Sequence, residues 1–483
     1  MAALIARTAS KRLCYRSILA SPSSLPCFKS FSTDQTRGKS RSTILGEHWE
    51  ELEEEFSLDR ADADPPKSRV ESLDDAFVGV RGHSSVIDKA DFAHARIGDV
   101  LEIPYEVTAS DFWREMWQSV FYQQDRIHTS IEYVNSLREY ESKKVGVVHD
   151  SSTKGIPIPF SQMLYAATSM AHVDDTRNVL DLSFRNCIYE RAVFPNDTLQ
   201  RHFVIENIRE SSNHKNILID LKCKMYNQHN ELVFRLEKTM FFEKLALSLD
   251  GRDVVKLSQS SKKGIAPVID TRSNESSAFK KYLLKQGSKA HSLTVMNPYS
   301  IKKIYKDELM LHTLQRPIGM ETNMNLSMLF RMTHPLLYNT NRYRDPGELY
   351  VGGVLLIALT HSIASKELYE VIYEELLDSH IINKASPNDC ISAMTYVIDV
   401  NDDKYEYFQE VECITIGLKN VDITAQLNNL KIPLSLFRPG IFPRDVENIC
   451  NKFMPQLSNK IVVHSYRKLL RHKPKHDTMI PLL

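Results

Sequence analysis

The chain has 483 residues, of which 42% are hydrophobic, so it is long and apolar enough to form more than one folded domain. Its 61 basic and 61 acidic residues give a formal net charge of 0, which provides no overall basic excess to favour nucleic acid as a default partner. The longest apolar runs, such as residues 350–360, are far shorter than the roughly 20 residues needed to cross a bilayer, so we predict no membrane span.

The first 33 residues contain no Asp or Glu, and five basic residues are spaced among Ser, Leu, Ile and Ala. This composition is typical of a mitochondrial transit peptide and differs from a secretory signal, which has a compact apolar centre. We therefore predict a transit peptide at residues 1–33, cleavage near residues 29–33, and the mitochondrial matrix as the location. A disordered basic tail is the alternative.

Cysteine usage fits a reducing compartment. Two of the seven cysteines lie in the predicted transit peptide, and the other five are scattered without a CxxC pair. This spacing predicts neither a disulfide framework nor a structural zinc site, so no metal is expected.

Residues 34–85 are polar and acid-rich, which predicts a linker. A first domain is expected at residues 86–245. Ser110 can cap a helix over residues 110–122, and an apolar helix is predicted over residues 160–172. The β-rich remainder predicts strands at residues 179–184, 198–208, 216–226 and 232–242.

The tripeptide Pro-Asn-Asp occurs twice, at residues 195–197 and 387–389. Each copy follows an apolar helix, at residues 160–172 or 349–365, and each precedes a β-rich segment. Because this ordered set of features recurs about 190 residues later, we predict a duplicated domain. The two tripeptides themselves are predicted to be turns, in which Pro fixes φ and Asn or Asp bonds to the nearby backbone.

The second domain is predicted at residues 301–433, after a Ser- and Lys-rich linker at residues 246–300. Its strands are expected at residues 391–400, 406–416 and 421–427. The remaining residues, 434–483, have no evident counterpart in the first half and are predicted to be a C-terminal extension. Their basic stretch at residues 460–475 either meets phosphates or an acidic partner or forms a helix packed on the body, which we favour.

One long helix beside a curved antiparallel sheet is an α+β arrangement. Residues 94–245 resemble a hot-dog domain of the MaoC-like family, which contains (R)-specific enoyl-CoA hydratases and mitochondrial hydroxyacyl-thioester dehydratases of type 2. Residues 320–430 resemble a second, more degenerate copy. The matching segments are residues 97–101, 125–129 with Tyr133, the helix after Pro159, 182–185 and 193–197 in the first copy, and 329–334 and 337–339 in the second. The resemblance implies tandem hot-dog domains, together a double hot-dog.

The resemblance also implies a catalytic site in the first copy. His128 lies where the family has its catalytic His, and Gln123 lies five residues earlier, where the family has Asp or Asn. Glutamine can orient a water molecule but cannot accept its proton, so Asp125 is a candidate substitute. A histidine without a catalytic role is the alternative for His128. Asp125 and Arg126 together form either part of the site or a solvated surface pair.

Two residues at the start of the first apolar helix are candidates for substrate binding. Phe160 and Ser161 stand where the family usually has His-Gly, and Arg126 is a third candidate. In the family, backbone N–H groups at this helix start stabilise the negative charge on the thioester oxygen. A side chain in place of glycine could obstruct the acyl group.

The second copy has lost its candidate base. Leu337, Met332 and His334 occupy the positions of His128, Gln123 and Asp125. Small residues remain at the helix start as Gly352-Gly353, but we predict that this half is not catalytic. Three other histidines have no partner at ligand spacing and are assigned no function: His149, His172 and His361.

Two functions are compatible with the sequence. In the first, the protein is a mitochondrial hydratase/dehydratase of 2-enoyl or (R)-3-hydroxyacyl thioesters carried by CoA or acyl carrier protein, active in one half at most and without a cofactor of its own. In the second, it is an inactive double hot-dog scaffold, a subunit of a mitochondrial complex. The retained His128 favours the first, whereas the acidic segment, polar linker and C-terminal tail favour partners.

Overall fold

The long strands of the first half contain the period-two pattern expected of a sheet with one covered face. In β5 (Asn216–Tyr226) the side chains of Ile217, Ile219, Leu221 and Cys223 are buried, and the residues between them are half-buried. The structure is a computed structural model that describes residues 96–103, 106–137, 155–169, 179–211, 216–243, 277–293, 301, 303–332, 334–341, 343, 349–427 and 431–474. The predicted transit peptide and the predicted linker at residues 34–85 lie outside the described residues, as do His149 and His172.

The predicted elements of the first half are present. Ser110 caps α3 (Asp111–Val120), because its Oγ accepts a hydrogen bond of 3.0 Å from the N–H of Trp113. The apolar helix is α6 (Phe160–Thr168), and the short α4 (Arg126–Thr129) precedes it. The strands are β1 (Val100–Glu102), β2 (Val107–Thr108), β3 (Val179–Tyr189), β4 (Thr198–Glu210), β5 and β6 (Leu232–Glu243).

The second half repeats this order. Its apolar helix is α10 (Gly353–Ala364), in which every residue is buried. Two shorter helical segments precede it, α9 (Met320–Leu329) and the 3-10 turn η6 (Pro335–Leu337). The strands are β7 (Leu309–Pro317), β8 (Val371–Ile381), β9 (Cys390–Asn401), β10 (Phe408–Lys419) and β11 (Ile461–His472).

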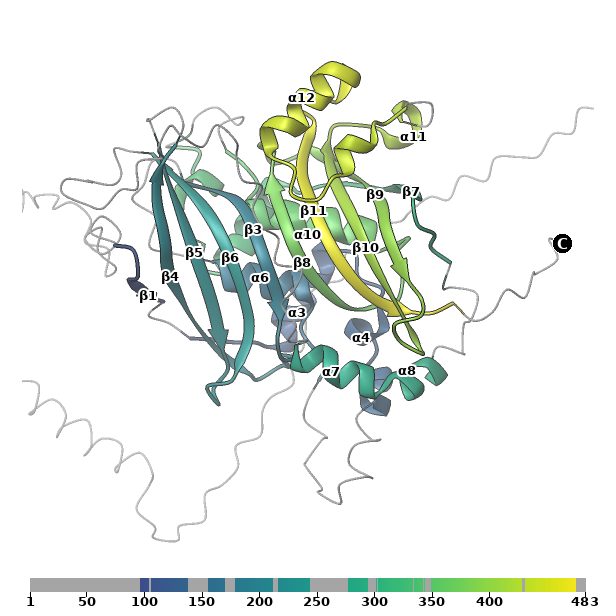
Figure 1. Cartoon of the computed structure of the whole chain (residues 1–483). Helices are drawn as coiled ribbons and strands as arrows, with labels where there is room; N and C mark the ends of the chain where they lie inside the picture. Colours follow the sequence, from purple (N-terminus) through teal and green to yellow (C-terminus); the bar gives the residue numbers. More distant parts are fainter. Residues whose placement is uncertain are drawn as a thin grey trace, which may run out of the picture. The chain divides into compact units, whose positions relative to one another are not determined.

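Both halves contribute to one antiparallel sheet. The strand order is β1-β4-β5-β6-β3-β8-β11-β10-β9-β7, with β2 paired to β4. β3 and β8 join the halves edge to edge, with a register that runs from Ser183 opposite His380 to Ile188 opposite Glu375. Figure 1 shows these two strands side by side at the centre of the sheet, with α6 and α10 behind it. The pairing of the two halves within one chain therefore has a direct structural basis.

The two Pro-Asn-Asp tripeptides form the same turn. Asn196 and Asn388 both have left-handed backbone conformations, with φ of 77° and 75°. The carboxylate of Asp197 accepts a hydrogen bond of 2.8 Å from Phe194 N, and that of Asp389 accepts one of 2.8 Å from Ser386 N. The predicted turn chemistry is confirmed.

The predicted C-terminal extension at residues 434–483 needs correction. Residues 461–472 are not a helix outside the second domain but form β11, which pairs with β8 on one side and β10 on the other. β11 therefore occupies the place in the second half that β6 occupies in the first. The sequence hides this strand because its charged side chains, among them Arg467 and Arg471, are buried together with its apolar ones, which removes the expected polar face.

Two other predictions differ from the structure. The predicted linker at residues 246–300 contains α7 (Ala278–Lys285) and α8 (Gly287–Leu293), and α7 contributes Phe279 and Leu283 to the main core. The strand predicted at residues 421–427 is instead a short helix, α11 (Ile423–Gln426), capped by the Asp422 carboxylate. The C-terminal segment also contains η7 (Leu434–Phe437), α12 (Pro443–Phe453) and η8 (Pro455–Leu457). No helix among the described residues is long and apolar enough to cross a membrane.

Candidate active site

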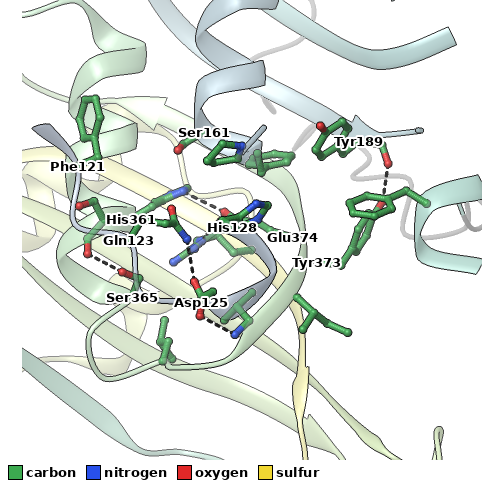
Figure 2. A pocket seen from close by; sticks show the side chains of 18 residues that line it. Phe121, Gln123, Asp125, His128, Ser161, Tyr189, His361, Ser365, Tyr373 and Glu374 are labelled. Carbon is green, nitrogen blue, oxygen red and sulfur yellow. Dashed lines mark hydrogen bonds and ion pairs between the residues drawn. The ribbon is translucent and has the colours of Figure 1, made fainter. Parts of the chain in front are cut away.

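A small cavity lies where the two halves meet, and it contains five of the six predicted site residues. The first half and α7 contribute Phe121, Gln123, Asp125, His128, Pro159, Phe160, Ser161, Tyr189 and Phe279. The second half contributes His361, Ser362, Ser365, Leu368, Val371, Ile372, Tyr373, Glu374 and Arg467. Figure 2 shows the labelled side chains around it. Its volume of about 50 Å³ is enough for a few water molecules.

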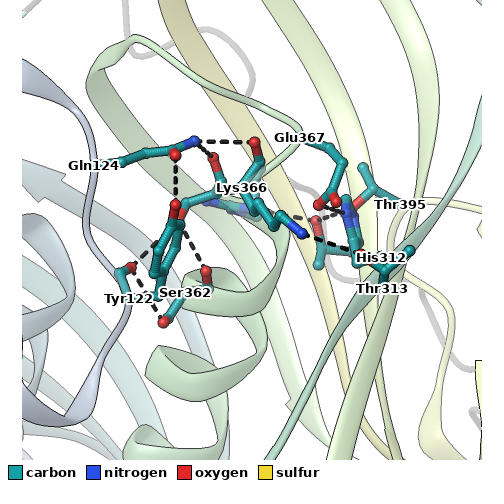
Figure 3. A network of polar contacts seen from close by, with 11 residues as sticks. Tyr122, Gln124, His312, Thr313, Ser362, Lys366, Glu367 and Thr395 are labelled. Carbon is teal, nitrogen blue, oxygen red and sulfur yellow. Dashed lines mark hydrogen bonds and ion pairs between the residues drawn. The ribbon is translucent and has the colours of Figure 1, made fainter. Parts of the chain in front are cut away.

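The loop that carries Gln123 is attached to the end of α10 in the other half. Gln124 Nε2 donates hydrogen bonds of 2.9 Å to the backbone oxygens of Ser365 and Lys366. Ser362 Oγ donates one of 3.2 Å to the backbone oxygen of Tyr122 (Figure 3). These contacts fix the position of the loop relative to the second half, so the geometry of the cavity depends on both halves.

His128 has the geometry of a neutral base. Its Nδ1 lies 3.1 Å from the backbone oxygen of Pro157, and since a carbonyl only accepts, Nδ1 carries the proton and Nε2 does not. No described residue forms a hydrogen bond with Nε2. Burial lowers the pKa of His128 to about 4, so the ring is neutral at physiological pH. Gln118 Nε2 donates a hydrogen bond of 2.7 Å to the His128 backbone oxygen and holds the residue in place.

Asp125 is buried, not part of a solvated surface pair. Its Oδ1 accepts a hydrogen bond of 2.9 Å from Val371 N, and its Oδ2 accepts one of 3.0 Å from Gln123 Nε2. Burial, assisted by the charge of Glu370, raises the pKa of Asp125 to about 8. The structure thus places Gln123 against Asp125, and both oxygens of that carboxyl group are already used by donors.

The predicted substrate-binding residues have different surroundings. Phe160 packs against Phe234 with ring centroids 5.5 Å apart, and Ser161 Oγ accepts a hydrogen bond of 3.2 Å from Trp117 Nε1. Both line the cavity at the start of α6. Arg126 does not line it, because its guanidinium group forms a 2.8 Å ion pair with the buried carboxylate of Glu370.

Three largely buried charged or titratable residues of the second half, His361, Glu374 and Arg467, line the same cavity. His361 Nδ1 lies 3.0 Å from Glu374 Oε1, and Arg467 Nε donates a hydrogen bond of 2.8 Å to the same oxygen. Burial and the charge of Arg467 lower the pKa of His361 to about 4. Burial acts to raise the pKa of Glu374, but Arg467 and His361 more than offset it, so this pKa lies well below its usual value and the carboxylate stays ionised.

Two solved structures share this architecture over most of their length. One is described as a MaoC domain dehydratase from Chloroflexus aurantiacus, with a TM-score of 0.56 and 15% identity, covering 79% of this chain and 97% of that one. The other is a Mycobacterium tuberculosis protein described as a double hot-dog, with a TM-score of 0.52 and 12% identity, covering 78% and 98%. No protein-family model and no curated protein matches the sequence.

The chain has a double hot-dog fold. The predicted α+β class and tandem hot-dog architecture are therefore confirmed. In this double hot-dog, each half supplies a central helix, and the sheets of the halves join through β3 and β8. At these identities the comparisons establish the fold and its MaoC-like resemblance, while the chemistry has to be argued from the cavity.

The double hot-dog has no comparable base at the matching place in its second half. Leu337 is buried, and Asn323 Nδ2 donates a hydrogen bond of 2.8 Å to its backbone oxygen. His334 Nδ1 accepts a hydrogen bond from Leu336 N and caps η6, much as Asp125 stands at the start of α4. Among the described residues, no cluster of three or more His, Cys, Asp or Glu side chains could hold a metal ion.

Sequence reasoning missed His361, Glu374 and Arg467. They come from α10, β8 and β11, so no spacing in the sequence connects them. One signal was available, because His361 interrupts a helix that is otherwise mostly apolar, and a buried polar side chain needs a partner. Arg467 was missed because residues 434–483 were interpreted as an extension, and Glu374 was missed because the strand β8 was not predicted.

Proposed function

We propose that the protein is a hydro-lyase that adds water to 2-enoyl thioesters or removes it from (R)-3-hydroxyacyl thioesters. The observation that carries the proposal is the buried His128, whose Nδ1–H is fixed by Pro157 and whose basic Nε2 remains available in a cavity between the halves. The MaoC-like double hot-dog fold supports the same reaction class. One site is proposed, in the first half.

The proposed reaction is a proton transfer coupled to a carbon–oxygen bond. His128 Nε2 removes a proton from water while the water oxygen bonds to C3 of the enoyl thioester. The electron pair of the double bond moves toward the thioester carbonyl, and the proton then passes to C2, which leaves His128 neutral again. The start of α6, with Phe160 and Ser161 on the cavity wall, would supply the backbone N–H groups that stabilise the negative charge on that carbonyl oxygen.

The carrier and location belong to the same proposal. We place the substrate on CoA or acyl carrier protein, with no further cofactor, because the reaction neither oxidises nor reduces its substrate. We place the protein in the mitochondrial matrix because residues 1–33 have the composition of a transit peptide. Fusion of residues 1–40 to a fluorescent protein should direct it to mitochondria, and a cytosolic signal would reject the location.

The decisive measurement is hydration of crotonyl-CoA, followed by the loss of enoyl-thioester absorbance. Purified wild-type protein should be active, and His128→Gln should lose between about 100-fold and 10,000-fold of kcat. The matched control is His229→Gln, which changes an exposed hairpin residue and should leave the rate unchanged. Inactivity of the wild-type protein toward CoA and carrier-protein substrates would reject the proposal.

That negative result would favour the second candidate, an inactive double hot-dog scaffold in a mitochondrial complex. One observation supports this candidate specifically. Gln123 replaces the carboxylate of the family, and its amide group is engaged by Asp125. Native electrophoresis of mitochondrial extracts should then place the protein in an assembly much larger than one chain, and migration as a free monomer or dimer would reject the scaffold.

A further inference from the structure

Hydration of an enoyl thioester needs the attacking water held by two groups, one of which takes the transferred proton. His128 Nε2 supplies one acceptor. The two oxygens of Asp125 accept hydrogen bonds from Val371 N and Gln123 Nε2, so this carboxyl group is already engaged in holding the loop. The second half of the chain places a further candidate acceptor, His361, on the wall of the same cavity.

His361 is a buried histidine with only one of its two ring nitrogens next to a partner. It is 4% exposed and lines the same cavity as His128; its Nδ1 lies 3.0 Å from Glu374 Oε1, but no described residue forms a hydrogen bond with its Nε2. His312, a buried histidine of the same half, is fully satisfied: Nδ1 lies 2.8 Å from Glu367 Oε2, and Nε2 lies 2.8 Å from Thr395 Oγ1 (Figure 3). An unsatisfied buried polar group costs free energy, and such groups are retained where they have a function.

The neighbours of His361 orient its ring for such a role. The ionised Glu374 carboxylate lies 3.0 Å from Nδ1, and Arg467, 4% exposed at its side chain, holds that carboxylate with a 2.8 Å hydrogen bond. A carboxylate beside Nδ1 favours the tautomer with the proton on Nδ1 and leaves Nε2 as an acceptor. Figure 2 shows His361, Glu374 and His128 around the same space.

We infer that His361 binds the reacting water from the second half of the chain, opposite His128, and that Glu374 and Arg467 position its ring. This inference rests on the proposed hydro-lyase function. The water donates one O–H to His128 Nε2, which takes that proton, and the other O–H to His361 Nε2, which only accepts a hydrogen bond. The proposed site in the first half therefore needs a residue from the second half, which has no base of its own at the matching position.

The first test separates function from stability. His361→Leu places an apolar side chain in the apolar helix α10 and removes the unpartnered Nε2, while Arg467 still pairs with the Glu374 carboxylate that loses Nδ1, so its melting temperature should stay close to that of the wild type. Its kcat for crotonyl-CoA should fall about 100-fold with little change in KM. His361→Asn, which restores an acceptor, should recover part of the rate. The control His312→Gln should lower the melting temperature and leave kcat unchanged.

The second test does not depend on turnover. In protein with isotope-labelled histidine rings, (R)-3-hydroxybutanoyl-CoA should shift the nitrogen resonance of His361, because its hydroxyl occupies the water position, whereas butanoyl-CoA should shift it far less. Full activity of His361→Leu in an active enzyme would overturn the role of His361 alone. An inactive wild-type protein with no shift would overturn the proposed function and this inference together.

Discussion

The carboxyl group of Asp125 in the first half accepts a hydrogen bond of 2.9 Å from the backbone N–H of Val371, the first residue of β8 in the second half. This contact joins the loop before His128 to the wall that carries His361 and Glu374. It also buries an ionisable group at the junction, which raises its pKa to about 8. The junction is therefore sensitive to pH.

The free energy of unfolding should fall with rising pH because of Asp125. Its pKa is raised from 3.8 to about 8 on folding, so between these values the folded protein keeps a proton that the unfolded chain has released. The contribution of Asp125 to the free energy of unfolding is fully present below pH 4. Between pH 4 and pH 8 this contribution decreases by at most about 1.4 kcal/mol for each pH unit. Asp125→Asn should remove this slope, since Gln123 can rotate its amide to accept from the new NH₂ group. Urea unfolding at several pH values measures how the free energy of unfolding depends on pH. The same dependence in the wild type and in Asp125→Asn would contradict the prediction.

Replacing Arg467 with Met should be strongly destabilising. Glu374 and Arg467 are 13% and 4% exposed at their side chains, so loss of the guanidinium group leaves a buried carboxylate without its partner. We expect a loss of about 3–5 kcal/mol in the free energy of unfolding. The exposed pair Lys306–Asp399 is the control, and Lys306→Met should change stability by less than about 1 kcal/mol. Similar effects for the two variants would show that the Arg467 pair is not buried as described.

Gln124→Ala should reduce catalysis more than stability. It removes the two 2.9 Å hydrogen bonds that attach the Gln123 loop to the end of α10, which loosens Gln123 and Asp125 without creating a core cavity. We expect kcat to fall about 10-fold or more, since small displacements of catalytic groups are costly, with a stability loss of about 1–2 kcal/mol. Gln315→Ala, at an exposed side-chain contact with Asp422, should change neither quantity. A Gln124→Ala enzyme with wild-type kcat would exclude this positioning role.

Phe279 should restrict acyl chain length. It lies on α7, its ring is 5.2 Å from Tyr189 and 6.0 Å from Tyr373, and it forms part of the cavity wall. Phe279→Ala should raise kcat/KM for 2-octenoyl-CoA relative to crotonyl-CoA by about 10-fold or more, as expected when a buried wall residue is truncated.

The matched control for Phe279 is Leu283→Ala on the same helix. Leu283 is 2% exposed but does not line the cavity, so its truncation should lower stability by about 2–5 kcal/mol without changing the chain-length ratio. If both variants change the ratio equally, the effect comes from loosening of α7, not from the space that Phe279 fills.

The sequence by itself determined the repeated unit. Alternation in residues 217–225, the Ser110 cap and the two Pro-Asn-Asp turns are local features, and each depends on side chains near one another in the chain. The same is true of His128, whose position relative to Gln123 and Asp125 is set by one short loop. Local physics therefore predicted the α+β class and the repeat, while the hot-dog architecture and the first-half site residues were implied by the resemblance to the MaoC-like family.

Tertiary structure decided the rest. β11 appears irregular in sequence because its buried Arg467 pairs with Glu374 on β8, a partner far away in the chain. α7 appears to be linker because its anchoring contacts lie on both halves. His361 can be recognised as a candidate site residue only in the fold, where α10, β8 and β11 place it beside Glu374 and Arg467 in the cavity that contains His128. Burial and charge pairing between distant residues have no sequence period, and for that reason the opposite wall of the site could be found only in the folded chain.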